Sequence, residues 1–339
     1  MNIKDIAKMA GVGVSTVSRV INNHPDVKDE TREKVKRIIK ESNYIPNDSA
    51  RILKKNNNNN IGVLVKGVFN PFFSEMISII SNRVGEAGYT MILQQNDFND
   101  VEDSDRLISF VKEKRLQALI CLGGNFNHIN EDTFKFLNIP IILTSVNTLY
   151  MDKANENQFS SIGIDNKKAA RDMTEYLINR GHKNIAIMLG DKEHDGISSQ
   201  RLEGYKEAMN KFSLEIKEKN ILIGEYTFDG AYKETKRFLK ENKDITAIFA
   251  ISDTMAVGAS KAALDLGLEV GKDISISGFD GMDIAKYYNP GITTVKQPNK
   301  DMATNSIDLL LALLTKKENH KHIVFETKII ERESCTSVK

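Results

Sequence analysis

The segment that most constrains this chain is its first twenty-two residues, where two short apolar helical patterns flank a glycine. Apolar residues recur at helical spacing up to Ala10, the pattern breaks at Gly11, and it resumes at Val17. Two helices that cross at a tight turn need a small residue in the first helix, here Ala7. They also need a turn residue that tolerates positive φ, here Gly11, and a branched apolar residue in the second helix, here Val17. Residues 3–22 therefore predict a helix-turn-helix, a motif typical of DNA binding.

The predicted second helix exposes Val14 together with hydroxyls, an amide and a guanidinium on Ser15, Thr16, Ser18, Arg19 and Asn22. These groups suit phosphates and base edges better than a core. Arg19 can pair with a guanine through two hydrogen bonds, and Val14 can contact a thymine methyl. The alternatives are a surface ion pair for Arg19 and simple packing for Val14.

Charge is distributed unevenly along the 339 residues. Residues 1–55 carry 12 Lys and Arg against 7 Asp and Glu, a net charge of +5, which leaves −4 for the rest of a chain whose total is +1. A basic amino-terminal segment on a mildly acidic body indicates a polyanionic partner at that end.

No apolar run is long enough for a signal peptide or a membrane span, so we expect a cytoplasmic protein. The two cysteines, Cys121 and Cys335, lie far apart without a metal-ligand spacing. In a reducing compartment, buried thiols are a better interpretation for them than a disulfide or a metal site.

A third helix is predicted over residues 29–42, with acids in its first turn and apolar Val35, Ile38 and Ile39. Residues 1–46 then form an all-α head. Residues 47–60 read as a hinge, because a short helical stretch at 47–55 precedes five asparagines, which offer no packing face.

From Ile61 onward, apolar strand runs alternate with amphipathic helices, several of which end at a glycine such as Gly88, Gly181 or Gly267. The runs are 61–65, 90–93, 118–122, 139–144, 185–189, 247–251 and 274–277. Such strands predict an α/β body of two parallel sheets with helices on both faces. Residues 160–165 are a plausible break between the sheets. Ligands of open α/β sheets bind beyond the carboxyl ends of the strands, so we expect a ligand in the cleft between two lobes.

Catalytic and cofactor motifs are missing from this pattern. No Gly-x-Gly-x-x-Gly follows a strand, and neither a Walker motif, a Gly-x-Ser-x-Gly nor a His-Glu-x-x-His is present. The six histidines are scattered. We therefore expect a protein that is not an enzyme and that needs neither a cofactor nor a metal.

Taken together, the head, hinge and body resemble the lactose-repressor (LacI/GalR) family of bacterial transcription regulators over essentially the full chain. The resemblance is carried by residues 3–12 (IKDIAKMAGV), 15–22 (STVSRVIN), 31–35 (TREKV), 43–47 (NYIPN), 180–182 (RGH), 201–205 (RLEGY), 252–258 (SDTMAVG), 278–280 (GFD) and 293–297 (TTVKQ). It implies a dimeric repressor whose body is like a periplasmic sugar-binding protein and whose effector changes operator affinity.

In the head, the resemblance places Val14, Ser15 and Arg19 toward base edges. It places Thr16, Ser18 and Asn22 toward the phosphate backbone, with Tyr44 in the same DNA-binding set. Gly13 stands where the family usually has a serine helix cap, which removes a side-chain hydrogen bond from the helix start.

In the hinge, the resemblance places Ala50 and Leu53 in a minor groove, where the leucine would wedge between base pairs. Ordinary hinge packing is the alternative for Leu53.

In the body, the resemblance assigns effector contacts to Asp165, Arg201, Tyr226, Asp253 and Asp280, and Phe72 and Phe73 join them because they stand at the first strand–helix turn. A guanidinium and a carboxylate facing one cleft each bind neighbouring hydroxyls, and flat rings suit a sugar face, which favours a carbohydrate. The alternatives are a structural ion pair between Arg201 and Asp280, a core role for the phenylalanines, and helix capping by Asp165 and Asp253.

The boundaries implied for the body assign 61–162 with 295–323 to an amino-terminal lobe and 163–294 with 324–339 to a carboxyl-terminal lobe. A β-type stretch at 322–335 is followed by no leucine heptads, so we expect a homodimer that binds pseudo-palindromic double-stranded DNA rather than a tetramer.

Three other functions compete with this one. A transport binding protein would share the body but would need an export signal. A sugar-modifying enzyme would need a catalytic set that Asp253 and Asp280 do not supply. A regulator of the same class could instead respond to a phosphoprotein co-repressor.

Overall fold

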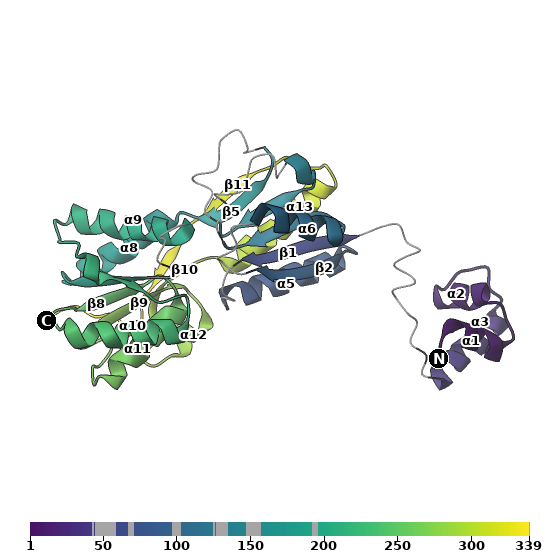
Figure 1. Ribbon diagram of the computed structural model, residues 1–339, viewed down its shortest axis with the longest axis horizontal. Helices are drawn as coiled ribbons and strands as arrows, with labels where there is room; N and C mark the ends of the chain where they lie inside the picture. Colours follow the sequence, from purple (N-terminus) through teal and green to yellow (C-terminus); the bar gives the residue numbers. More distant parts are fainter. Residues whose placement is uncertain are drawn as a thin grey trace. The chain divides into compact units, whose positions relative to one another are not determined.

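The computed structural model describes residues 1–42, 44, 59–66, 71–96, 103–124, 126, 135–146, 157–191 and 196–338. The chain divides into two compact units, Met1–Asn58 and Asn59–Lys339 (Figure 1). We call the first unit the head and the second unit the body.

The head contains the three predicted helices, α1 (Ile3–Ala10), α2 (Val14–Ile21) and α3 (Asp29–Glu41). Gly11 ends α1 with a φ of 67°, a left-handed conformation that glycine adopts without a steric penalty. The helices share one small core of buried residues: Ile6, Ala7, Ala10, Val17, Val20, Val27, Val35 and Ile38. The helix-turn-helix prediction is thus confirmed, and Ala7 and Val17, expected at the crossing of α1 and α2, are both buried in this core.

The two helices of the motif begin differently. Asn2 accepts hydrogen bonds from the backbone amides of Lys4 and Asp5, and the Asp5 side chain in turn accepts one from the Asn2 amide, which forms a capping box on α1. Gly13 caps α2 without any side-chain hydrogen bond. The start of α2 is therefore less well stabilised than the start of α1.

The first lobe of the body is built on a six-stranded sheet in the order β11-β5-β4-β3-β1-β2. The strands are β1 (Asn60–Lys66), β2 (Thr90–Asn96), β3 (Leu116–Leu122), β4 (Ile141–Thr144), β5 (Ser160–Ile164) and β11 (His322–Phe325). All neighbours pair in parallel. The helices α5 (Phe72–Glu86) and α13 (Asn299–Leu314) pack into one core cluster, and α6 (Asp103–Glu113) packs into another.

The second lobe has a sheet of the same design, in the order β12-β10-β9-β8-β6-β7. Its strands are β6 (Ile185–Leu189), β7 (Ile221–Ile223), β8 (Ala247–Ala250), β9 (Ser275–Asp280), β10 (Thr293–Lys296) and β12 (Lys328–Ile330). Among the described strand pairs of this sheet, β12 pairs antiparallel with β10 and the other neighbours pair in parallel.

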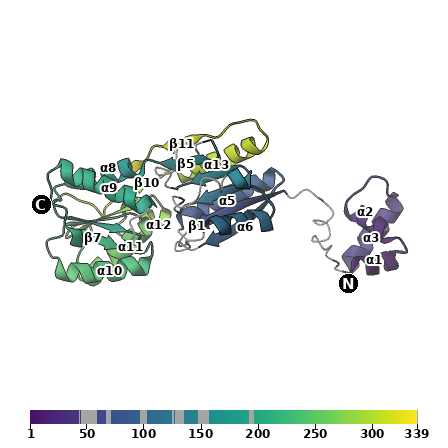
Figure 2. The same ribbon diagram turned by 45° about the horizontal axis from the view of Figure 1, so that its top comes forward.

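Four long helices cover the second sheet. α8 (Asn166–Ile178) and α9 (Gly196–Lys211) lie on one face, and α10 (Phe228–Glu241) and α11 (Asp253–Asp265) lie on the other (Figures 1 and 2). Two short helices, Glu218–Asn220 before β7 and α12 (Asp283–Tyr287) after β9, complete the lobe.

The chain crosses between the lobes three times. It leaves the first sheet after β5, returns to the first lobe between β10 and α13, and leaves again between β11 and β12. We call these segments the first, second and third crossings. The boundaries expected from sequence, at 162, 294 and 323, each fall inside a strand, and the strands place the crossings slightly later.

Two strands of the first sheet were read differently from sequence. Residues 160–164, taken as a break between sheets, form β5, because neighbours on both sides supply its hydrogen bonds although its sequence is rich in serine and glycine. The β-type stretch that begins at 322 divides into β11 and β12, which belong to different sheets.

Both cysteines are buried free thiols, as predicted. Within the described ranges, no helix is both long enough and apolar enough to cross a membrane. Over the same residues, no group of three or more His, Cys, Asp and Glu side chains is arranged to hold a metal ion.

Candidate DNA-reading and effector sites

The outer face of α2 presents the side chains that the sequence assigned to DNA. Val14, Ser15, Arg19 and Asn22 are exposed, and Thr16 and Ser18 are half-buried. Val14 keeps 40% of its surface exposed while Val17, one turn on, keeps none, so simple core packing does not account for Val14. The helix therefore separates a buried apolar face from an exposed face of hydroxyls, an amide and a guanidinium.

Arg19 lies in an ion pair with Asp26, which follows α2. Arg19 Nη1 is 3.1 Å from Asp26 Oδ2, and the two side chains are 58% and 44% exposed. The surface ion pair considered from sequence is therefore present. An exposed pair of this kind stabilises a fold by about 0–1 kcal/mol, so it leaves Arg19 available to a stronger partner.

The remaining DNA-binding candidates divide between the head and the hinge. Asn22 donates a hydrogen bond from Nδ2 to the Ser18 carbonyl, 2.8 Å away, at the end of α2. Tyr44 packs half-buried against the head core, and its amide donates to the Ile39 carbonyl. Ala50 and Leu53 lie outside the described residues, so their assignments stay predictions.

In the second lobe, Arg201 of α9 is almost fully buried. Its Nε donates to Asn166 Oδ1 at 3.0 Å and its Nη1 donates to the Ile251 carbonyl at 2.6 Å. The guanidinium carbon lies 3.5 Å from the centre of the Phe279 ring, a cation–π contact. Burial lowers the pKa of Arg201, and the negative charge of Asp280 opposes that shift. The two side chains predicted to face one ligand therefore influence each other electrostatically.

Asp253, at the first turn of α11, is completely buried. Its Oδ1 accepts a hydrogen bond from Thr294 Oγ1 and its Oδ2 accepts one from the Met282 amide, each at 2.6 Å. Burial, followed by the like charge of Asp280, raises the pKa of Asp253 well above its usual range. The helix cap of α11 is Ser252, so the alternative in which Asp253 caps its helix is wrong.

Asp280 ends β9 and is also buried. Gln297 holds it from the second crossing, because Gln297 Nε2 donates to Asp280 Oδ1 at 2.8 Å and the Gln297 amide donates to the Asp280 carbonyl at 3.2 Å. Asp280 has a φ of 112°, which a non-glycine residue adopts only under strain. Strained residues of this kind concentrate at functional sites.

Tyr226, which follows β7, is a second candidate with an unusual backbone, at a φ of 53°. Its hydroxyl lies 2.8 Å from Ser198 Oγ, and Ser198 Oγ donates to Asp191 Oδ2 at 3.0 Å. A Cβ on Gly190 would come within 1.8 Å of the Tyr226 ring, so a residue without a side chain is required there. Burial raises the pKa of Tyr226 to about 12, and the phenol remains protonated at neutral pH.

The structure does not bring all the predicted effector residues together. Arg201, Tyr226, Asp253 and Asp280 gather around the carboxyl ends of strands in the second sheet. Phe72 and Phe73 are buried in the first-lobe core, in an edge-to-face pair with ring centres 5.3 Å apart. Asp165 is exposed and caps α8 by accepting a hydrogen bond from the Lys168 amide.

Sequence reasoning missed the two residues that hold the charged pair. Asn166 binds Arg201 from the end of the first crossing, and Gln297 binds Asp280 from the second crossing. Gln297 lies within the 293–297 motif that carried the resemblance, and Asn166 directly follows Asp165, so both were next to a recognised signal.

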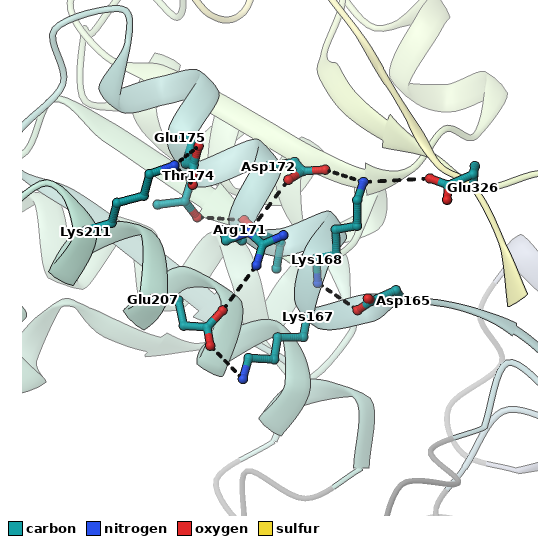
Figure 3. A network of polar contacts seen from close by, with 11 residues as sticks. Asp165, Lys167, Lys168, Arg171, Asp172, Thr174, Glu175, Glu207, Lys211 and Glu326 are labelled. Carbon is teal, nitrogen blue, oxygen red and sulfur yellow. Dashed lines mark hydrogen bonds and ion pairs between the residues drawn. The ribbon is translucent and has the colours of Figure 1, made fainter.

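A network of polar contacts extends from α8 and α9 to the third crossing (Figure 3). Lys168 Nζ lies 2.9 Å from Asp172 Oδ2 and 3.7 Å from Glu326 Oε2, and Glu326 stands between β11 and β12. The hydrogen bond to Asp172 and the charge of Asp172 raise the pKa of Lys168. Since Glu326 is 87% exposed, its contact with Lys168 stabilises the crossing by less than about 1 kcal/mol.

A helix-turn-helix head joined to a two-lobed α/β body, with buried charges at the carboxyl ends of one sheet, defines a class: DNA-binding regulators whose body has the design of a binding protein. Comparison with known proteins agrees in both parts. Residues 2–47 match the family described as bacterial regulatory proteins, lacI family, and residues 174–335 match the periplasmic binding protein-like domain.

Relatives match the chain over almost its whole length. The HTH-type transcriptional regulator MalR of Clostridium butyricum is 59% identical over 100% of both chains. The repressor PurR of Proteus mirabilis is 34% identical over 98% of this chain and 96% of its own. The catabolite control protein A of Priestia megaterium is 32% identical over 96% of each. The chain belongs to the lacI family and is an HTH-type, DNA-binding transcriptional regulator.

Solved structures show the same fold. The transcriptional regulator CelR in complex with cellobiose has a TM-score of 0.72 and 27% identity, covering 98% of this chain and 99% of its own. A lac repressor dimer bound to operator and an anti-inducer has a TM-score of 0.74, covering 99% of each chain, and at 24% identity it supports the fold alone.

Proposed function

We propose that the chain is a cytoplasmic homodimeric repressor, without enzymatic activity, whose operator affinity is controlled by a carbohydrate bound between the two lobes. The observation that carries this proposal is the gathering of Arg201, Asp253, Asp280 and Tyr226 at the carboxyl ends of the second sheet. Ligands of such sheets bind at that edge. The cellobiose in the CelR structure is an independent reason to favour a sugar.

The chemistry of this group suits a ligand with several hydroxyls. A buried guanidinium donates hydrogen bonds, a carboxylate accepts them, and a tyrosine ring offers a flat apolar surface to a sugar face. The sequence carries no recognised catalytic motif, and the carboxylates of Asp253 and Asp280 already accept hydrogen bonds from Thr294, Met282 and Gln297. Binding without turnover is therefore the proposed activity.

We infer that the effector acts through the crossings. Arg201 is hydrogen-bonded to Asn166 at the first crossing, and Asp280 is hydrogen-bonded to Gln297 at the second crossing. A ligand that engages Arg201 and Asp280 would change how both segments are held. If its affinity differs between two lobe arrangements, it shifts their populations and, through the hinge, operator binding.

A thermal-shift screen of sugars, sugar phosphates and nucleobases tests the effector class. A cognate ligand at 100 times its Kd adds about 2.7 kcal/mol to the free energy of unfolding, which raises the melting temperature. Asp280→Asn should abolish the shift while operator affinity stays largely intact. Asp265→Asn, at a carboxylate that pairs with Lys261 and Tyr232 on the surface of the same lobe, is the matched control and should keep the shift.

Two outcomes would contradict this part of the proposal. One is a melting shift confined to nucleobases, which would exclude a carbohydrate. The other is chemical conversion of the bound sugar by the purified protein, detected by chromatography, which would restore the enzyme alternative.

For the head, we propose that Val14, Ser15 and Arg19 contact base edges and that Thr16, Ser18 and Asn22 contact phosphates. Arg19→Ala should then relax sequence preference at one base pair, by about 1–3 kcal/mol of discrimination. Asn22→Ala should instead weaken binding to all duplexes by a similar factor. Dissociation constants on a duplex selected from a randomised pool and on its single-base variants measure both effects. Equal losses across sequences for both variants would contradict the assigned roles.

A further inference from the structure

The loop between α2 and α3 contains a chain of side-chain contacts that ends on Arg19. Arg32 of α3 donates from Nη2 to the His24 carbonyl at 2.6 Å and to the Val27 carbonyl at 3.3 Å. The His24 ring Nδ1 is 2.7 Å from Asp26 Oδ1, and Asp26 Oδ2 is 3.1 Å from Arg19 Nη1. The two oxygens of one carboxylate thus bind separate partners, and the Asp26 side chain is held from both sides.

The loop that carries Asp26 is itself well fixed. Val27 is buried in the head core, and the Arg32 side chain beneath the loop is only 16% exposed. The His24 amide donates to the Arg19 carbonyl at 2.9 Å, and Pro25 restricts the backbone of the residue before it. The residues on both sides of Asp26, His24 and Val27, are therefore anchored to α2, α3 and the head core.

This contact leaves most of the Arg19 guanidinium unused. A guanidinium has five N–H donors in a rigid plane, and the contact with Asp26 engages one nitrogen, Nη1. The donors on Nε and Nη2 remain available for a base edge, where an arginine makes two parallel hydrogen bonds. An arginine held by one edge keeps fewer rotamers, so less entropy is lost when the other edge binds.

We propose that Asp26 is a specificity-determining residue that holds Arg19 in the orientation from which it reads a base, and that keeps it from the phosphates of other sequences. The proposal rests on the proposed role of Arg19. A free arginine reaches phosphates on any duplex, which adds affinity without sequence information. The Asp26 carboxylate lowers this sequence-independent affinity in two ways. It pairs with the Arg19 guanidinium when no suitable base is present, and its negative charge repels the DNA phosphates.

The test uses the full-length chain and two probes, a duplex selected from a randomised pool and a random-sequence duplex of equal length, at one fixed salt concentration. The readout is a specificity ratio, the dissociation constant on the random-sequence duplex divided by the dissociation constant on the selected duplex. Both constants are measured by fluorescence anisotropy. Asp26→Asn should lower this ratio about two- to fivefold, the range of an exposed charge pair. Asp29→Asn removes the same charge from a fully exposed side chain at the start of α3, with its nearest cation, Arg32, 4.0 Å away. It should strengthen both complexes alike and leave the ratio unchanged.

Arg19→Ala provides the second arm. When Arg19 is already alanine, Asp26→Asn should change the ratio no more than Asp29→Asn does. The reason is that Asp26 is proposed to act through the Arg19 guanidinium, which this variant lacks. If Arg19→Ala lowers the ratio but Asp26→Asn in the wild-type background does not, the inference about Asp26 is wrong and the role of Arg19 stands. If Arg19→Ala leaves the ratio unchanged, both are wrong. Melting curves of each variant establish that the ratios compare folded proteins.

Discussion

The head and the body place their functional side chains in opposite environments. In the head, Arg19 is 58% exposed and stands on a helix whose core side carries Val17 and Val20. In the body, Arg201 is 4% exposed, Asp280 is 5% exposed and Asp253 is fully buried. The proposed recognition residues of the head are thus distinct from its core residues, whereas the proposed effector contacts of the body are themselves buried.

This difference agrees with the two ligands proposed for the two parts. Duplex DNA is a large charged surface, so a helix can meet it with side chains that stay hydrated until contact. A small polar ligand has to be surrounded, so its partners must be buried before it arrives, and each buried charge then needs compensation from the protein itself. Substitutions on the exposed face of α2 should therefore alter binding alone, and substitutions at the body site should alter binding and stability together.

The largest expected effect is on Arg201. Arg201→Met keeps much of the side-chain volume but leaves buried Asp253 and Asp280 without the nearby cation, so we expect a loss of about 3–5 kcal/mol in the free energy of unfolding. Arg237→Met, at a 61% exposed position of α10, should change stability by less than about 0.5 kcal/mol. Urea denaturation followed by circular dichroism measures both. Equal stability of the two variants would contradict the view that the charges at the body site are buried and compensate one another.

A smaller effect concerns His182, which is buried between Thr246 Oγ1 at 3.0 Å and the Thr336 carbonyl at 3.1 Å. Burial lowers the pKa of His182 below its usual value of 6.5. When pH falls through 6.5, the unfolded chain takes up a proton that the folded chain does not, so stability falls with pH in that range. His182→Gln should flatten this dependence in melting curves between about pH 7.5 and 5.5. An unchanged slope in the variant would show that other groups cause it.

The smallest expected effect is in the head, at Gly13. A serine there would have its Cβ 3.5 Å from Ser15 Oγ, an ordinary contact, and Gly13 already has the extended backbone of a helix cap. The added hydroxyl can accept a hydrogen bond from an amide of the first turn, so Gly13→Ser should stabilise the head by a few tenths of a kcal/mol. Native-state hydrogen exchange of the α2 backbone amides would measure this gain in stability. Destabilisation would mean that α2 starts elsewhere.

Local signals account for the parts of the protein that the sequence predicted well. The turn at Gly11 and the crossing at Val17 depend on residues within one short segment, and helical periodicity reports them directly. The long apolar runs of the body likewise indicated β1, β3, β6 and β8, because a strand buried on both faces has to be apolar throughout.

Prediction was weaker where an element depends on distant neighbours. β5 has the sequence SSIGI, which carries little strand signal, and its ladder forms only because β4 and β11 lie on either side. For Arg19, a surface ion pair was the alternative to a guanine contact, and its partner Asp26 was not named, because spacing alone does not identify which acidic residue lies beside the guanidinium. Asn166 gave no signal of its own and Gln297 gave one only as part of the 293–297 motif, because an amide acquires its role from the group that it contacts.

The amino-acid sequence by itself determined the helix-turn-helix, the alternation that produces two parallel sheets, and the residue types available for recognition, since these depend on local propensity and periodicity. The tertiary structure alone decided which charges share one environment. Asn166 and Arg201 are 35 positions apart, and Asp253 and Thr294 are 41 apart, yet each pair is in hydrogen-bond contact. Such contacts follow from the order of strands in a sheet and from the crossings between lobes, and both are set by packing of the whole body rather than by any single segment.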